Sequence, residues 1–342
     1  MFAVGLSLTL ATVAQLGSIA QTSPAAACEA LLDLRNLTLT SARLVDSNTT
    51  GVTYCYVKGI LSPAIGFHTQ LPLPDQWNGR YLTWGDGGKD GDLDFADARV
   101  AEGYAVANSN TGHDNGVEPG SSFGWHNRQA EIDFGYRAVH LTTAAGKALT
   151  RAYYGADPEY SYFEGCSTGG RQGLMEAQRY PDDFDGIVAG APVNYYQALN
   201  ASRMWLMQQV YANDLEASLT VDTTGDGQPD SDRKLVMLAE QVMAACDGVD
   251  GVTDGVINDP TRCDFTPARD LADMMCLDNV NRDNCFTHAQ LALIETLYAG
   301  THDSAGTLVY QGKPFGSERL SLIHISEPTR RYAISYAVFC LK

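Results

Sequence analysis

Hydrophobic and polar positions along residues 54–193 follow two periods, one typical of strands and the other typical of helices. The runs GRYLTWGDGG and EGYAVANSNTG are short and β-rich and end in glycine or polar residues, which predicts two strands with loop exits. DFGYRAVHLTTAAGKALTRAYYG has the apolar spacing of a helix that ends at Gly155. YSYFEGCSTGGRQGLMEAQRYP predicts a strand, a sharp turn and a helix, and FDGIVAGAPV predicts a further buried strand. Strands that alternate with helices indicate an α/β fold with a mostly parallel sheet.

After Asn194 the pattern changes to a helical segment, an Asp/Gly-rich middle and a cluster of four cysteines between Cys246 and Cys285. This composition is typical of an inserted cap rather than of more sheet. We therefore expect an α/β domain over residues 21–194 and a cap over residues 195–319.

The N-terminal residues form an apolar run followed by small residues, which predicts a signal peptide over residues 1–20. A core segment is the alternative, because no basic residue precedes the run. Eight cysteines fit a secreted protein, extracellular or periplasmic. The net charge of -18 argues against nucleic acid and anionic membranes as partners.

Gly165-Cys166-Ser167-Thr168-Gly169 fits the G-x-S-x-G nucleophile elbow, with a predicted strand before it and a helix after it. Small residues at this spacing let the chain turn sharply and expose the Ser167 hydroxyl, while the backbone N–H of Thr168 would face an oxyanion. The alternative is a tight turn with a solvated serine. The glycine loop after the strand at residues 80–83 is a candidate second oxyanion donor, or a plain turn.

Three aspartates at short intervals lie on a glycine-permitted loop: Asp247, Asp250 and Asp254. Such a loop suits a hard cation with oxygen ligands, and we favour Ca²⁺ over a solvated acidic turn. The spacing of the cysteines predicts three disulfides, Cys28–Cys55, Cys246–Cys263 and Cys276–Cys285. Zinc is disfavoured because no C-x-x-C spacing occurs.

Four segments together resemble the tannase and feruloyl esterase family of secreted serine esterases: WNGRYLTWGDGG, DFGYRAVHLTT, EGCSTGGRQGLMEAQRYPDDFDGIVAGAPV and CDGVDGVTDGVINDPTRCDF. The resemblance implies an α/β-hydrolase core, present here in its N-terminal part, with an inserted Ca²⁺-binding lid. It also implies roles for single residues: Ser167 as nucleophile, Thr168, Gly87 and Gly88 as oxyanion donors, and Asp247, Asp250, Asp254 and the carbonyls of Val252 and Val256 as Ca²⁺ ligands.

In this family the catalytic serine and histidine each adjoin a cysteine, and the two cysteines form a disulfide. None of the seven histidines here adjoins a cysteine, so the resemblance leaves the partner of Cys166 missing, together with the catalytic Asp and His. Residues 320–342 begin LSLIHISEPTR, which matches a translated sequencing adapter, and we expect this tail to be non-native. On that interpretation Cys166–Cys340 is not a native bond, and this chain alone is nearly inactive.

The sequence thus predicts a secreted esterase of small aromatic esters, galloyl, feruloyl or related, that acts through an acyl-enzyme on Ser167. A catalytically dead, Ca²⁺-stabilised binding module is the alternative. Reactivity of Ser167 in the full-length parent toward a fluorophosphonate probe separates the two, because only an activated serine reacts quickly.

Overall fold

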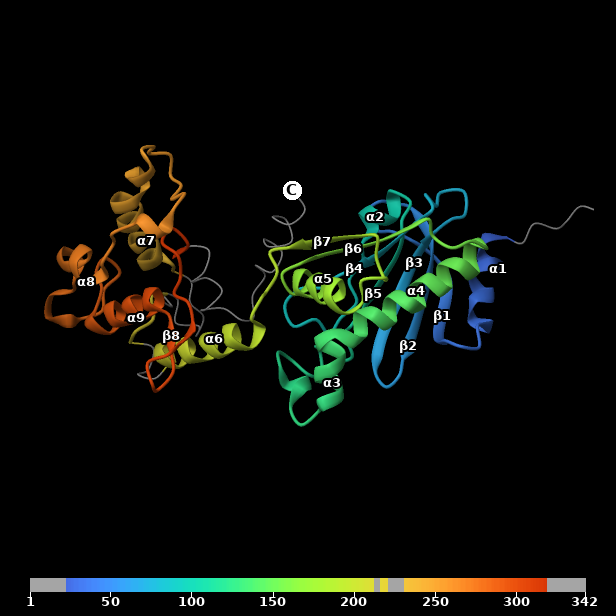
Figure 1. Ribbon diagram of the computed structural model, residues 1–342, viewed down its shortest axis with the longest axis horizontal. Coiled ribbons are helices and arrows are strands. Elements are labelled where there is room, and N and C mark those ends of the chain that lie inside the picture. Colours follow the sequence, from blue (N-terminus) through green and yellow to red (C-terminus); the bar gives the residue numbers. More distant parts are fainter. Residues whose placement is uncertain (1–22, 212–215, 221–230, 319–342) are drawn as a thin grey trace, which may run out of the picture. The chain divides into compact units, whose positions relative to one another are not determined.

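The computed structural model describes residues 23–211, 216–220 and 231–318. The predicted signal peptide and the predicted tail at residues 320–342 lie outside these residues, so both stay predictions. The chain forms two compact units that divide between Pro192 and Val193, close to the expected change of character after Asn194 (Figure 1). None of the described helices combines the length and the hydropathy that a membrane crossing requires.

The first unit is built on a seven-stranded sheet with the order β1-β2-β3-β5-β4-β6-β7. The four strands β5, β4, β6 and β7 are parallel, and β1, β2 and β3 join them by antiparallel pairing. The strands are β1 (Thr38–Asp46), β2 (Thr53–Leu61), β3 (Ile65–Pro72), β4 (Arg80–Trp84), β5 (Ala105–Ser109), β6 (Tyr160–Cys166) and β7 (Gly186–Gly190).

The parallel half confirms the α/β interpretation, whereas the antiparallel half was not expected. The connection from β2 to β3 is too short for a crossover, because Leu61 pairs directly with Ile65, so these strands can only form a hairpin. The run that forms β7 was expected to be a buried strand, but its residues are only partly buried or exposed. The reason is its position, since β7 is the last strand of this sheet.

Helices cover both faces of this sheet. The long helix α4 begins after a π-helical turn at Asp133–Arg137 and ends, as predicted, at Gly155, whose φ of 73° is left-handed. Its buried face joins a core that includes Phe67, Tyr81 and Leu149. The remaining helices of this unit are α1 (Pro24–Glu29), α2 (Asp97–Ala101), α3 (Arg128–Ile132) and α5 (Thr168–Arg179), and α4 itself spans Ala138–Tyr154.

A disulfide between Cys28 and Cys55 fixes α1 to the sheet, as predicted. Both cysteines are fully buried and belong to the same core as α4. The N-terminal segment is therefore an integral part of the first unit.

The second unit is mostly helical, with a small hairpin. Its core is formed by leucines of α7 and α9 together with Phe265 and Phe286. The buried Lys234 ammonium donates hydrogen bonds to the side-chain oxygens of Asn281 and Gln290 inside this core. The elements are α6 (Tyr196–Tyr211), α7 (Arg233–Cys246), α8 (Pro267–Asp270), α9 (His288–Ala299), β8 (Thr301–His302) and β9 (Leu308–Tyr310).

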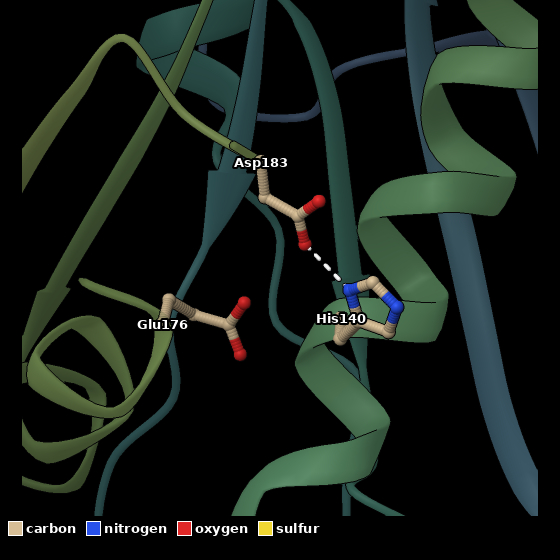
Figure 2. A group of neighbouring side chains, drawn as sticks. All are labelled: His140, Glu176 and Asp183. Carbon is tan, nitrogen blue, oxygen red and sulfur yellow. Dashed lines mark hydrogen bonds and ion pairs between the residues drawn. The ribbon is translucent and has the colours of Figure 1, made fainter. Parts of the chain in front are cut away.

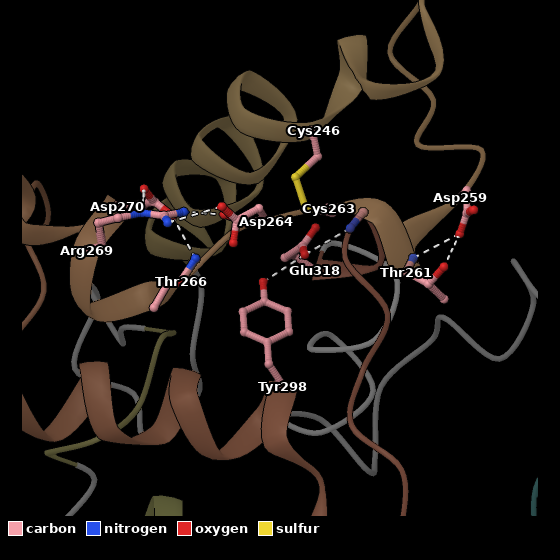
Figure 3. The surroundings of a disulfide bond; sticks show 11 residues. Cys246, Asp259, Thr261, Cys263, Asp264, Thr266, Arg269, Asp270, Tyr298 and Glu318 are labelled. Atoms are coloured by element: carbon pink, nitrogen blue, oxygen red, sulfur yellow. Dashed lines mark hydrogen bonds and ion pairs between the residues drawn. A yellow bond between two sulfur atoms is a disulfide. The ribbon is translucent and has the colours of Figure 1, made fainter.

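Two further disulfides stabilise the second unit, Cys246–Cys263 and Cys276–Cys285, and both confirm the predicted pairing. Figure 3 shows the first of them at the end of α7, with the Tyr298 hydroxyl donating to the Glu318 carboxylate nearby at 2.8 Å. The loop that contains the three predicted calcium-ligating aspartates runs between Cys246 and Cys263. This disulfide therefore closes the acidic loop at both ends.

Candidate active site

Ser167 lies at a sharp turn between the end of β6 and the first residue of α5, as the G-x-S-x-G motif predicts. Its backbone has φ 59° and ψ -113°, a conformation that residues with a side chain rarely adopt. The turn is held by the Ser167 N–H, which donates to the Gly190 carbonyl of β7 at 3.0 Å. Strained residues of this kind are concentrated at functional sites, and this residue is half-buried.

The glycines of the motif are required by space. A Cβ added to Gly165 would lie 2.7 Å from the Gly169 carbonyl carbon, and one added to Gly169 would lie 2.8 Å from the Asp86 carbonyl oxygen. A Cβ on Gly170 would collide with the Gly190 carbonyl oxygen. Strand, turn and helix therefore approach each other closely only because these positions carry no side chain.

The glycine loop after β4 packs against the first turns of α5. The Gly169 N–H donates to the Asp86 carbonyl at 2.6 Å, and the Thr168 hydroxyl donates to the Gly88 carbonyl at 2.6 Å. A Cβ on Gly87 or Gly88 would meet no atom within 4 Å, so the outer side of this loop is open. The structure thus brings together the predicted nucleophile, Thr168 and the Gly87–Gly88 loop, although their catalytic roles stay predictions.

Gln172 connects the loop to the helix and was not singled out from the sequence. Its side-chain oxygen accepts from the Asp86 N–H at 3.2 Å, and its amide nitrogen donates to Asp90 Oδ2 at 2.9 Å. Because Gln172 lies one turn after Thr168 on α5, helical spacing places both on the side that faces the loop. Asn108 of β5 supports the loop from the other side by donating to Asp86 Oδ1 at 2.8 Å.

Two buried aspartates of this loop favour their neutral forms. Burial raises the pKa of Asp90 to about 8, although Arg171 opposes the shift. Burial also raises the pKa of Asp86, and the neighbouring Asp90 adds to that shift. The neutral forms keep negative charge away from the turn at which an ester oxyanion would develop.

Among the described residues, no histidine or aspartate side chain hydrogen-bonds to the Ser167 hydroxyl. His113, which follows β5, is buried against Phe123, with 3.8 Å between ring centroids, and His140 pairs with Asp183. Cys166 is disulfide-bonded, and its partner lies outside the described residues. The expectation that Cys166 lacks its native partner therefore stays a prediction.

The acidic loop of the second unit carries ionisable oxygen donors. The Asp247 carboxylate accepts from the Gly255 N–H at 3.0 Å, and Asp250 accepts from the Val252 N–H at 2.9 Å and from Asn258. These donors lower the pKa of Asp250, so its carboxylate is ionised at neutral pH. An all-oxygen donor set fits Ca²⁺ in its chemistry.

The geometry of this loop does not by itself form a cation site. Asp247, Asp250 and Asp254 do not each bring an oxygen within 4.8 Å of the others, whereas another group in the described part of the chain does converge in this way. The calcium site, including the carbonyls of Val252 and Val256, stays a prediction.

Comparisons with known proteins identify relatives over most of the chain. The family model for tannase and feruloyl esterase matches residues 47–332. A protein named "Probable feruloyl esterase B-2" from Aspergillus flavus is 35% identical over 252 residues, which are 73% of this chain and 45% of the relative. An uncharacterized esterase from Xanthomonas campestris is 33% identical over 332 residues, 91% of this chain and 54% of the relative.

Among solved structures, feruloyl esterase B from Aspergillus oryzae superposes with a TM-score of 0.71 at 27% identity, covering 93% of this chain and 65% of that one. The chain spans about half the length of the curated relatives that it matches.

Proposed function

Because the chain belongs to the tannase and feruloyl esterase family, we propose that it contributes the nucleophile and oxyanion donors of a serine carboxylic ester hydrolase. The observation that carries this proposal is the strained Ser167 turn, packed against an open glycine loop. The names of the relatives favour feruloyl and related aromatic esters as substrates. The three disulfides that join described cysteines favour an oxidising compartment, in line with a secreted protein.

The proposed reaction begins when Ser167 Oγ attacks the ester carbonyl carbon. The hydroxyl proton passes to a general base, and the carbonyl oxygen gains the negative charge of the tetrahedral intermediate. The N–H groups of Thr168 and of the Gly87–Gly88 loop would receive this charge, since the Gly169 N–H is already bonded to Asp86. Collapse of the intermediate releases the alcohol, which takes up the proton, and leaves the acyl group on Ser167. Water then hydrolyses the acyl-enzyme.

We expect the general base to come from outside the described residues, because none of the hydrogen bonds that the described histidines make reaches Ser167. A serine hydroxyl without a base is a poor nucleophile at neutral pH. We therefore expect the 342-residue chain alone to hydrolyse aromatic esters slowly, by about three orders of magnitude or more below an intact triad enzyme.

Added imidazole tests the proposal on the chain as it stands. Imidazole supplies a base in solution, so the rate of hydrolysis of a p-nitrophenyl ester should rise with imidazole concentration beyond the rate without protein. The variant Ser167→Ala should abolish this protein-dependent increase. Ser161→Ala, which changes a buried serine on the strand β6 that leads to Ser167, should retain it.

Covalent labelling provides the second readout. Mass spectrometry after prolonged exposure to a fluorophosphonate probe, with imidazole present as the base, should place the label on the peptide that contains Ser167. If wild-type protein and Ser167→Ala respond equally to imidazole and to the probe, the nucleophile assignment is wrong. The binding-module alternative is then the better account, because it needs no reactive serine.

A further inference from the structure

Three potential metal ligands converge in the first unit, away from the Ser167 turn. Figure 2 shows His140 of α4, Glu176 of α5 and Asp183 of the connection between α5 and β7 facing one another. One ligand atom from each lies within 4.8 Å of the other two. In the part of the chain that the structure describes, no other group of three histidine, cysteine or carboxylate side chains meets this condition.

Glu176 provides a second, independent observation. Its residue is only 1% exposed, and neither carboxylate oxygen has a hydrogen-bond partner among the described residues. Its carboxylate points toward His140 and Asp183 (Figure 2). Burial raises the pKa of Glu176 to about 8, and the nearby Asp183 adds to the shift. A buried carboxylate without a partner is costly, and a bound cation would remove this cost.

We propose that His140, Glu176 and Asp183 bind a divalent transition-metal ion of the Zn²⁺ type. One imidazole nitrogen and two carboxylates form a mixed donor set that suits Zn²⁺ better than the hard cations Ca²⁺ and Mg²⁺. The side chains of His140 and Asp183 are 33% and 21% exposed, so an ion can enter from solvent and keep a water molecule as its remaining ligand.

The adjustment that binding requires is small. His140 Nδ1 and Asp183 Oδ2 lie 2.6 Å apart, whereas two ligands of a tetrahedral zinc ion lie about 3.3 Å apart. The hydrogen bond would be exchanged for two bonds to the ion. Tyr180 stacks on the His140 ring at 3.9 Å between centroids and holds its plane.

One neighbouring charge opposes the ion. The Lys147 ammonium donates a hydrogen bond to the Asp183 backbone carbonyl, and it also interacts electrostatically with the Asp185 carboxylate. Two carboxylates and a divalent ion balance each other, and the Asp185 carboxylate offsets the charge of Lys147.

The experiment is a Zn²⁺ titration of the full chain in competition with a chromophoric chelator. Excess Ca²⁺ is present throughout, so that the acidic loop of the second unit does not compete for zinc. We expect one zinc ion per chain at this site. Co²⁺ in place of zinc should give visible absorption bands, which report nitrogen and oxygen ligation of low symmetry and do not depend on ester turnover.

Variants separate a metal site from a protonated buried acid. Glu176→Gln keeps the size of the side chain and should weaken zinc binding at least about tenfold. His140→Gln, at a partly exposed position, should weaken it to a similar extent. Glu131→Gln and His126→Gln change exposed residues of the same types and should bind zinc as the wild type does.

Unchanged zinc affinity in Glu176→Gln or in His140→Gln would overturn the proposal. So would a wild-type chain that binds no zinc while Glu176→Gln raises its thermal midpoint, because that result identifies Glu176 as a buried neutral acid. If Glu176→Gln does not fold, His140→Gln decides the question. Either result leaves the esterase proposal untouched, since that proposal depends on Ser167 alone.

Discussion

The backbone of Ser167 predicts an unusual order of stability between two small substitutions. Alanine keeps a Cβ in the strained conformation of φ 59° and ψ -113°, whereas glycine adopts it freely. Such strain costs about 1 to 3 kcal/mol. Glycine also loses about 0.5 to 1 kcal/mol more conformational entropy on folding than alanine does. The Ser167→Gly variant should therefore be more stable than Ser167→Ala, with a difference of about 1 kcal/mol.

A matched pair at Ser122 gives the opposite order. Ser122 is exposed, begins a short helical turn and has no positive φ, so alanine should be the more stable replacement there by about 0.5 to 1 kcal/mol. The comparison of the two sites cancels effects that are common to any Gly/Ala exchange. What distinguishes them is the sign of the difference in free energy of unfolding.

Urea unfolding followed by tryptophan fluorescence measures these differences. Of the four tryptophans, Trp205 alone lies in the second unit, so a Trp205→Phe background makes the signal report the first unit. A difference of 1 kcal/mol shifts the urea midpoint by about 0.3 to 1 M. If Ser167→Ala is as stable as Ser167→Gly or more so, the turn is not strained and the central observation behind the proposed nucleophile fails.

Two other predictions concern charge. Burial raises the pKa of Asp90 from its ordinary value of 3.8 to about 8, so its contribution to stability is complete below pH 4 and is lost as the pH rises toward 8. Asp90→Asn should flatten this decline in urea midpoints measured from pH 5 to 8.5, whereas an unchanged slope would contradict the assignment. For the predicted calcium loop, Ca²⁺ should slow amide hydrogen exchange over residues 247–263. Asp250→Asn should remove this protection, whereas the exposed control Asp273→Asn should retain it. If Ca²⁺ does not change hydrogen exchange in the wild type, the loop is a solvated turn.

The nucleophile elbow could be predicted from the sequence because its residues are close together along the chain. Gly165, Ser167 and Gly169 are close in the chain, and the strand before them and the helix after them follow from periodicity alone. The support of the glycine loop by Gln172 and Asn108 depends on β4 lying between β5 and β6. Strand order is a long-range property that a single sequence does not display.

Glu176 illustrates the same limit for buried charge. On α5 it is the kind of residue that a helical pattern assigns to solvent, and only the packing of the helix and its neighbours buries it. Its encounter with His140 and Asp183 joins residues far apart in the chain. The antiparallel pairing of β2 with β3 was missed for a simpler reason: the alternation of strands and helices was expected over the whole of residues 54–193, although β2 and β3 follow each other with no helix between them.

The close approach around Gly165, Gly169 and Gly170 has a consequence for mutational tolerance. Any missense change at a glycine codon adds a Cβ, and at each of these positions a Cβ would meet backbone atoms that no rotamer change can move. Single-nucleotide changes that replace the glycine at any of these three positions should therefore be destabilising rather than neutral. Gly87 and Gly88 face open space, and Gly87 also lacks a positive φ. A saturation mutagenesis library scored for the amount of folded protein should tolerate no substitution at Gly165, Gly169 and Gly170 but many at Gly87. This contrast depends on the space around each glycine and not on catalytic chemistry.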